Sequence, residues 1–512
     1  MKKAIYILLL IIASWSCTSD FLNTRPQSDT DVTTIFETVE NAELAINGLC
    51  KLMTIKYSNT AIYGEGTIKY FYGNYLGNDF QVSNYTKYFR TTNGLYLEDN
   101  THYTDWYPWF YYYKLISNAN AVICNIDNAK GSIEKKQFIK AQALTFRAYS
   151  YFMLSQFYCR RWVDSNNGGS RGLPLRIDES FGDLAASTLA EVYGQIYADL
   201  DEAIGLYQSS GLNRPANDNY SPNMDVAYAT YARAALTRED WENAERYARF
   251  ARESYPLMSA AEYKDGGFSL PNKEWIWSSY GAVDESLSHS SFFANMGSNS
   301  SASIGKNNPG AISKELYNRI PATDIRHEMF LDPLQDTVDY SNGAAATTLT
   351  NRAKTKYASK LNSESVIFAY MQFKFQAQAL PGVGHLNHFR AAEMYLIEAE
   401  ACCHLPGREK DVCQLLQELN SDRDPAYTCM QTGDALLEEV KLYRRIELWG
   451  EGFDWFDHKR WNVSIVRKTF NEGGSFADAF AITLNPGDIN RWTFVYPSRE
   501  VDYNGLISSS KE

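Results

Sequence analysis

Aromatic rings and short polar side chains gather in two turn-rich stretches of the sequence, and this mixture suits the binding of sugars. A sugar presents apolar C–H faces edged by hydroxyls, so its site needs flat rings beside a few placed amides and carboxylates. We predict a shallow platform of eight such residues, in which the amides and the carboxylate bond sugar hydroxyls. They are Asn78, Asp79, Phe80, Asn84, Tyr85, Tyr88, Tyr280 and Phe292. The alternative interpretation is that these rings only pack at the surface.

Two common motifs for catalysis are absent from the sequence. It contains no His-Glu-x-x-His and no phosphate-binding loop. His385 and His388 lack neighbouring ligands, and the acidic residues at 332, 336 and 339 lack the Gly and Glu of a calcium loop. We therefore predict a binding protein rather than an enzyme, with no catalytic residues, no metal and no cofactor. A spatially formed acid/base pair for glycoside cleavage stays open as an alternative, because its spacing is not visible in sequence.

The segment 442–461 interleaves large aromatic residues with charged ones. Trp449, Phe453, Trp455, Phe456 and Trp461 alternate with arginine, glutamate and aspartate. Charged groups are rarely buried unless paired, and rings are rarely exposed at this density. The segment therefore predicts a helix, a break at 450–452, and a short second helix that ion pairs hold over a core of rings. Glu393 and Glu400 lie two turns apart in an apolar helical segment and are predicted to be buried ion-pair partners.

The N-terminus has the pattern of a lipoprotein signal. Lys2 and Lys3 precede an apolar run over 4–13 that is too short to cross a bilayer, and Cys17 follows the small residue Ser16. We predict that residues 1–16 are a signal peptide, that Cys17 is lipidated, and that residues 17–30 form the tether of the mature protein. Ordinary secretion, with Cys17 merely nearby, is the alternative.

Composition indicates an acidic globular protein. The formal net charge is −12 over 512 residues, and it becomes −14 (47 basic minus 61 acidic residues) without Lys2 and Lys3. Such a surface repels phosphate backbones, so we predict no nucleic-acid partner. Seven cysteines follow Cys17 without a Cys-x-x-Cys pair, which argues against a zinc ribbon or a disulfide scaffold. One bridge, for example Cys413 to Cys429, remains open in an oxidising compartment.

Hydrophobic periodicity predicts a mainly α-helical chain. Trp106, Trp109 and Tyr113 keep helical spacing and are read as core, a capping box at Thr188–Glu191 opens one helix, and Trp275–Trp277 alternates like a short strand. Alanines alternate with large residues in paired helices, as in tetratricopeptide-like hairpins, without a strict repeat. The predicted helices span 31–51, 103–128, 132–158, 188–207, 223–237 and 240–254.

Several segments, in order along the chain, resemble motifs of the SusD/RagB family, the surface glycan-binding lipoproteins of Bacteroidetes-type bacteria. Residues 444–461 match its Arg-Arg-x-Glu-Leu-x-x-Glu-Gly-x-x-x-Phe-Asp-x-x-Arg-Trp signature, and residues 17–26 match its Cys-x-x-Asp-Phe-Leu-x-x-x-Pro opening. Further matches lie at 143–152, 172–175, 389–401 and 495–501. The resemblance therefore spans essentially the whole mature chain.

This resemblance implies the fold, the location and the partner. It predicts a single SusD-like domain over 31–512, with helical hairpins and long irregular aromatic-rich loops. It implies a protein that is lipid-anchored in the outer membrane, exposed at the surface, and bound to oligo- or polysaccharide. The glycan would be delivered to a SusC-like TonB-dependent transporter for nutrient uptake. A surface glycosidase and a helical scaffold or adhesin without sugar binding are the rival hypotheses.

Overall fold

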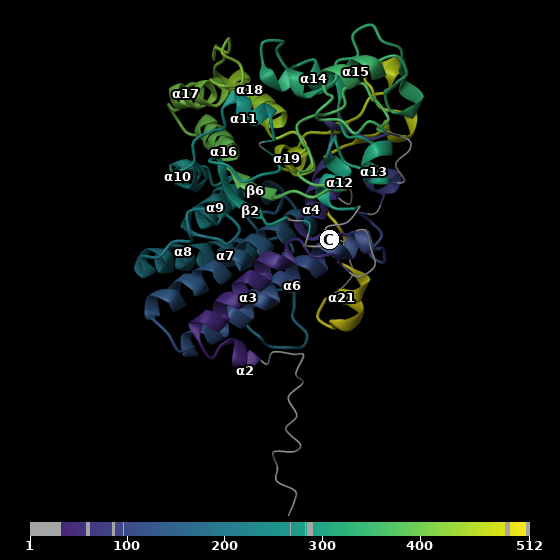
Figure 1. The fold of residues 1–512 in the computed structure, drawn as a ribbon. Helices are drawn as coiled ribbons and strands as arrows, with labels where there is room; N and C mark the ends of the chain where they lie inside the picture. Colours follow the sequence, from purple (N-terminus) through teal and green to yellow (C-terminus); the bar gives the residue numbers. More distant parts are fainter. Residues whose placement is uncertain are drawn as a thin grey trace, which may run out of the picture.

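The computed structural model describes residues 32–57, 62–83, 88–95, 97–266, 268–281, 283, 290–486 and 492–507. The protein is mainly α-helical, as predicted (Figure 1). The predicted signal peptide (1–16), Cys17, the tether (17–30), Asn84 and Tyr85 lie outside the described residues. Within the described part of the chain, no helix is both long and apolar enough to cross a membrane.

The longer helices pack on one another in chain order. They are α3 (Val39–Leu52), α6 (Tyr103–Asn125), α7 (Ile133–Tyr158), α8 (Leu189–Ser210), α9 (Met224–Arg238), α10 (Trp241–Arg252), α16 (Ala391–Cys403), α17 (Glu409–Asn420), α18 (Gly433–Glu447) and α19 (Asp454–Trp461), and the four-residue α2 (Val32–Ile35) precedes them. Each helix from α6 to α10 packs on the next, α10 packs on α16, and α16 packs on α17 and α18. In Figure 1 this stack climbs from α6 and α7 at the lower end to α17 and α18 at the upper end. The predicted helical hairpins are thereby confirmed.

Buried alanines explain the close packing of α9, α10 and α16. Ala227 and Ala234 of α9, Ala244 and Ala248 of α10, and Ala399 of α16 are buried. Interaxial distance between packed helices depends on the side chains at the contact, so small residues let the helices approach.

Side-chain caps fix the starts of α3 and of α6 to α10. Thr188 and Glu191 form the predicted capping box of α8, and Asp240 caps α10 after Glu239 adopts a left-handed conformation with φ of 62°. The single helix predicted over 31–51 is wrong in one respect, because α2 and α3 are separate. Thr38 caps α3 through Asn41 N–H (3.2 Å), and the extended backbone of Thr38 pairs with Lys130.

Short antiparallel pairs join distant parts of the described chain. They are β1 (Phe80–Gln81) with β3 (Ala311–Ile312), β2 (Trp275–Ser279) with β6 (Leu386–Arg390), β4 (Val338–Asp339) with β5 (Ala345–Ala346), and β7 (Ile465–Val466) with β8 (Thr483–Leu484). The strand predicted at Trp275–Trp277 is confirmed as β2 and is buried throughout. Its register sets Trp275 opposite Arg390 and Ser279 opposite Leu386.

The other helical elements are short. They are α4 (Gly64–Thr67), the π-helix η2 (Ile68–Asn74), α5 (Phe89–Thr92), η3 (Ile126–Asn128), η4 (Trp162–Asp164), α11 (Ala260–Lys264), α12 (Phe292–Met296), α13 (Ser303–Asn307), α14 (Lys314–Tyr317), η6 (Ile325–Met329), η7 (Tyr340–Asn342), α15 (Thr350–Lys356), η8 (Phe470–Glu472), η9 (Asp478–Phe480) and α21 (Ser498–Tyr503).

The segment 442–461 has the predicted form of two helices around a glycine break. Between α18 and α19, Gly450 and Gly452 have φ of 78° and 91°, a region that favours glycine. A Cβ on Gly452 would also lie 2.7 Å from the Cα of Lys69. Trp455 is fully buried among Phe157, Phe456 and Phe494. This motif is therefore part of the core, as expected.

A buried network of ion pairs links this motif to the rest of the fold. Arg390 of β6 bonds Glu274 (2.6 Å), Glu447 (2.8 Å) and Glu451 (2.7 Å). Burial by itself raises the pKa of Glu447, but the surrounding arginines outweigh burial and hold that pKa below its ordinary value. Glu393 and Glu400 pair with Arg233 (2.7 Å) and Arg460 (2.5 Å), so both predicted ion-pair partners are confirmed.

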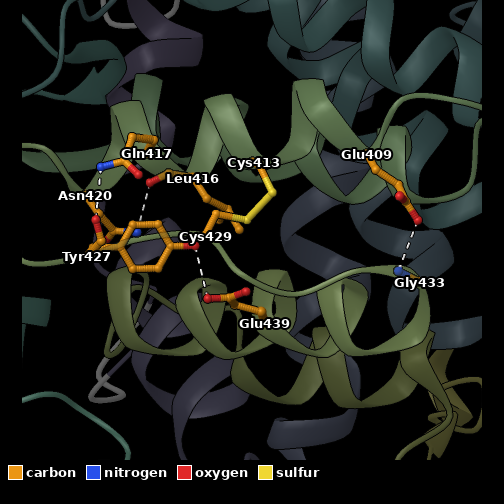
Figure 2. Close-up of a disulfide and its surroundings, with 9 residues drawn as sticks. All are labelled: Glu409, Cys413, Leu416, Gln417, Asn420, Tyr427, Cys429, Gly433 and Glu439. Carbon is orange, nitrogen blue, oxygen red and sulfur yellow. Dashed lines mark hydrogen bonds between the residues drawn. A yellow bond between two sulfur atoms is a disulfide. The ribbon is translucent and has the colours of Figure 1, made fainter.

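One disulfide closes the upper end of the helical stack (Figure 2). It joins Cys413 of α17 to Cys429, which precedes α18, and so realises the bridge that the sequence left open. Tyr427 lies beside it and donates to Glu439 of α18 (3.0 Å), while Gln417 donates to the Tyr427 carbonyl (3.1 Å). Cys50, Cys124, Cys159, Cys402 and Cys403 are free thiols.

Candidate functional site

Two rings of the predicted platform are buried in the core. Phe80 lies in β1, is 2% exposed, and stacks on Trp449 with ring centroids 5.3 Å apart. Phe292 begins α12 and packs edge-on against Phe375 at 5.5 Å. The prediction that these are exposed loop rings is wrong. Large rings gain free energy from leaving water, and here distant elements cover both faces.

The polar residues next to Phe80 form hydrogen bonds and an ion pair with other parts of the fold. Both oxygens of the buried Asp79 carboxylate accept from Arg445 at 2.7 Å. Burial raises the pKa of Asp79, but the Arg445 guanidinium outweighs it and the pKa lies below its ordinary value. Asn78 donates to Asp79 (3.3 Å) and accepts from the backbone N–H of Val466 (2.8 Å). These groups stabilise the fold instead of pointing to a ligand, so their predicted role toward sugar hydroxyls has no support in this geometry.

Tyr280 is the exposed member among the predicted residues that the structure describes. Its side chain is 44% exposed, and its ring meets Tyr220 at 5.3 Å and His385 at 5.2 Å, both edge-on. Tyr88 is half-buried and packs edge-on against Phe71 at 5.2 Å. The structure therefore does not bring the described members of the platform onto one surface.

A different aromatic surface lies between α6 and α21, and we call it the α6–α21 cleft. It encloses about 550 Å³ and is walled by α6, α21 and residues 174–184. Figure 1 shows α21 beside α6 at the lower end of the molecule. Residues spaced by three and four share one face of a helix, so α6 directs four rings to this side. The lining rings are Trp106, Trp109, Phe110 and Tyr113 of α6 and Tyr503 of α21.

The helical spacing of these α6 rings was predicted, but their assignment to the core is only partly right. Trp109 is buried, whereas Trp106 and Tyr113 are half-buried and Phe110 is 36% exposed. In the sequence, the cleft is marked by a stripe of aromatic residues on α6 that is wider than the helix face that packs on the core. Phe110, one residue after Trp109, extends the stripe toward solvent.

Hydrogen bonds and ring contacts hold the walls of the cleft in place. Trp109 Nε1 donates to Glu500 Oε2 (3.3 Å), and the Arg499 guanidinium lies 4.8 Å from the Trp106 ring centre. Asn504 donates to the Leu184 carbonyl (2.9 Å) and accepts from the Leu184 N–H (3.3 Å). The cleft is thus preformed, with Lys114, Arg176 and Arg499 balanced in part by Asp183 and Glu500. Ring faces beside such mixed polar groups suit a polar molecule that has apolar C–H faces.

The candidate metal ligands of the sequence are bonded to other side chains. His388 Nε2 lies 2.6 Å from Ser279 Oγ, and His385 Nδ1 lies 3.2 Å from the Tyr220 hydroxyl. Asp336 pairs with Arg352 (2.5 Å) and Asp339 caps η7. The part of the chain that the structure describes contains no cluster of three or more His, Cys, Asp or Glu residues placed to hold a metal ion.

Comparison with solved structures finds the same fold over nearly the whole chain. A SusD-like carbohydrate binding protein from Bacteroides vulgatus has a TM-score of 0.75 at 24% identity, covering 93% of this chain and 99% of its own. A SusD superfamily protein from Bacteroides thetaiotaomicron has a TM-score of 0.74 at 21% identity, covering 92% and 99%. A putative sugar binding protein from Bacteroides vulgatus has a TM-score of 0.70 at 20% identity, covering 92% and 98%. These similarities confirm the predicted fold class.

Family models cover both halves of the sequence. Residues 20–236 match the model described as starch-binding and associating with the outer membrane, and residues 242–499 match the model of the SusD family. No curated protein matches the chain significantly. The second model alone spans half of the chain and includes the paired α18–α19 motif. The chain belongs to the SusD family.

Proposed function

We propose that this protein is a surface lipoprotein that binds an oligo- or polysaccharide and passes it, uncleaved, to a SusC-like TonB-dependent transporter. Membership of the SusD family supports the binding of glycans and association with the outer membrane, because a matching model is described as starch-binding at that membrane. Lipidation at Cys17 would supply the anchor. Delivery to the transporter follows from the family resemblance of the sequence.

The observation that carries the proposal is the α6–α21 cleft. Its rings present apolar surface, and the carboxylates of Asp183 and Glu500 and the amide of Asn504 line the same cleft. A ring that covers on the order of 60 Å² of sugar C–H surface contributes about 1.5 kcal/mol. Two or three rings, less the cost of association, give affinities of about millimolar to micromolar. Weak binding suits a protein that hands its cargo onward.

The test is retention of purified protein in affinity gels that contain candidate glycans, with new reducing ends measured in parallel. Phe110→Ala should weaken retention about tenfold, because it removes one ring face. Phe250→Ala is the matched control, since Phe250 is 38% exposed but lies on α10. Equal loss in both variants, or no loss in Phe110→Ala, would move the site away from the cleft. Release of reducing ends would favour a glycosidase, and neither binding nor cleavage would favour a scaffold.

Because Tyr280 is exposed, the predicted loop platform remains a second candidate site for glycan binding. Its ring packs on Tyr220 and His385, and it is the exposed member of the predicted platform among the residues that the structure describes. The same gels should be run with Tyr280→Ala and Tyr85→Ala. Loss of retention in these variants, with Phe110→Ala unchanged, would assign glycan binding to the loops.

The transporter is tested separately from the glycan. Gentle detergent extraction of native membranes should recover this protein together with a large TonB-dependent transporter. Recovery as an isolated lipoprotein at native expression would contradict delivery. If Phe110→Ala abolished co-purification but kept glycan retention, the cleft would be a protein contact instead of a sugar site.

A further inference from the structure

A second cavity, of about 380 Å³, lies at the C-terminal end of α7 and is lined by basic side chains. We call it the basic cavity. Its polar lining comprises Arg160, Arg161, Asp164, Lys459 and Asn462, with Trp492 as an apolar wall. Three cationic side chains thus face one carboxylate, in a chain whose formal net charge is −12. The concentration of positive charge at this point runs against the overall charge of the protein.

Lys459 of α19 is a buried amine at the wall of this cavity. Its Nζ donates to the carbonyls of Gln156 (2.6 Å) and Cys159 (2.9 Å), and within the described residues no carboxylate lies within ion-pair distance of it. When it is protonated, this amine has three donors, so one of them remains without a partner among the described residues. Attraction to the C-terminal carbonyls of α7 explains why a cation lies here. These carbonyls do not supply a counter-ion, so burial disfavours the charged form of the amine.

Arg160 and its neighbour Arg161 differ in their bonding. Arg161 forms a two-pronged pair with Asp164 at 2.7 and 2.9 Å. The half-buried Arg160 guanidinium, by contrast, makes neither a hydrogen bond nor an ion pair with any residue that the structure describes. A guanidinium presents paired donors that match the two oxygens of a carboxylate or sulfate. Arg160 therefore offers paired donors to an anion in a cavity that Lys459 also lines.

We propose that the basic cavity binds an oxyanion, namely the carboxylate or sulfate group of an acidic saccharide, with Arg160 and Lys459 as the groups that contact it. The volume falls in the range of small-ligand sites, and the largely buried Trp492 forms part of the cavity wall. This site is separate from the α6–α21 cleft, whose charges are mixed. The proposal therefore stands or falls independently of glycan binding in the cleft.

Calorimetry at constant ionic strength tests the proposal with sodium glucuronate and with sodium sulfate as probes. Wild type should bind both, and Arg160→Gln should weaken both about tenfold, the loss expected for one charge-assisted hydrogen bond. Arg319→Gln removes the same charge from an exposed position outside the cavity and should change neither affinity. Equal weakening in both variants, or no binding of glucuronate, would overturn the proposal. Binding of sulfate alone would mean an inorganic anion site and would contradict the saccharide assignment.

A proton-linkage measurement tests Lys459 itself. Burial lowers the pKa of Lys459 to about 7, and a bound oxyanion favours the charged amine, so binding at pH 7.5 should take up part of a proton. Titration in two buffers of different ionisation enthalpy measures this uptake, which Lys459→Met should abolish. The other charged or titratable groups that the described residues place around this region are Arg160, Arg161, Asp164, Cys159, Tyr193, Glu239 and Arg460. Anion binding without proton uptake would remove Lys459 from the site.

Discussion

Asp105, in the first turn of α6, is a buried carboxyl that forms no ion pair with any residue that the structure describes. Within the described part of the chain neither of its carboxyl oxygens has a hydrogen-bond partner. Burial raises its pKa to about 9, with a smaller contribution from Asp99. The unfolded chain ionises this group above about pH 4. Its contribution to stability is therefore lost progressively as the pH rises from about 4 to about 9.

Asp105→Asn should consequently stabilise the protein at neutral pH. Three pH units above the unfolded pKa correspond to at most about 4 kcal/mol, so we expect a gain of a few kcal/mol at pH 7 and almost none at pH 4. Urea unfolding at the two pH values measures it. Asp422→Asn, at an exposed position, should give no gain. An equal effect of Asp105→Asn at both pH values would show that the carboxyl is ionised in the folded protein.

Trp455 belongs to the core and not to a ligand site. Its ring is fully buried against Phe157 and Phe494, so Trp455→Ala should lower the free energy of unfolding by about 3–5 kcal/mol. Denaturant titration measures the loss. Glycan retention by the folded fraction should stay near wild type. A stable Trp455→Ala protein that loses retention selectively would instead place this motif in a binding site.

Among the elements, the α17–α18 connection depends on its disulfide. The bridge closes a loop of 16 residues that packs between two helices (Figure 2). Removing such a cross-link frees the unfolded chain and costs about 3 kcal/mol. Cys413→Ser with Cys429→Ser should therefore lower stability by about that amount, and wild type with reductant should behave alike. Cys124→Ser, at an exposed free thiol, is the control. Wild type that is insensitive to reductant would contradict this expectation.

At the scale of the whole molecule, the described chain begins in α2, at the same end as the α6–α21 cleft (Figure 1). Fourteen residues lie between Cys17 and Val32, enough to reach about 50 Å when extended. A lipid on Cys17 would therefore hold the cleft end near the membrane. This arrangement agrees with passing cargo to a transporter in that membrane.

The anchor can be tested directly. Cys17→Ala should abolish lipid labelling and leave the protein unprocessed or released, because the thiol is the acylated atom. Fractionation and lipid labelling measure both effects, with Cys124→Ser as the matched cysteine variant. A Cys17→Ala protein that remains in the outer membrane with unchanged labelling would rule out the lipoprotein assignment.

The sequence by itself determined the features that depend on neighbouring residues. Periodicity defined α6, α7, α9 and α10, side-chain caps fixed the starts of α8 and α10, and paired charges among rings predicted α18, the glycine break and α19. These are local signals, because caps, periods and strained glycines act within one or two turns. The family motifs extended the same kind of evidence to the whole fold.

Tertiary structure alone decided which rings meet solvent. Phe80 is buried because Trp449, which is far away in the sequence, stacks on it. The Asp79 carboxylate is paired because Arg445, also far away in the sequence, donates to it. Phe110 remains exposed because α21 covers Trp109 but leaves its neighbour open. Whether a ring is core or site depends on the segment that folds over it, and no local pattern encodes that partner. The basic cavity is likewise assembled from α7, α19 and the residues around Trp492, which only the fold brings together.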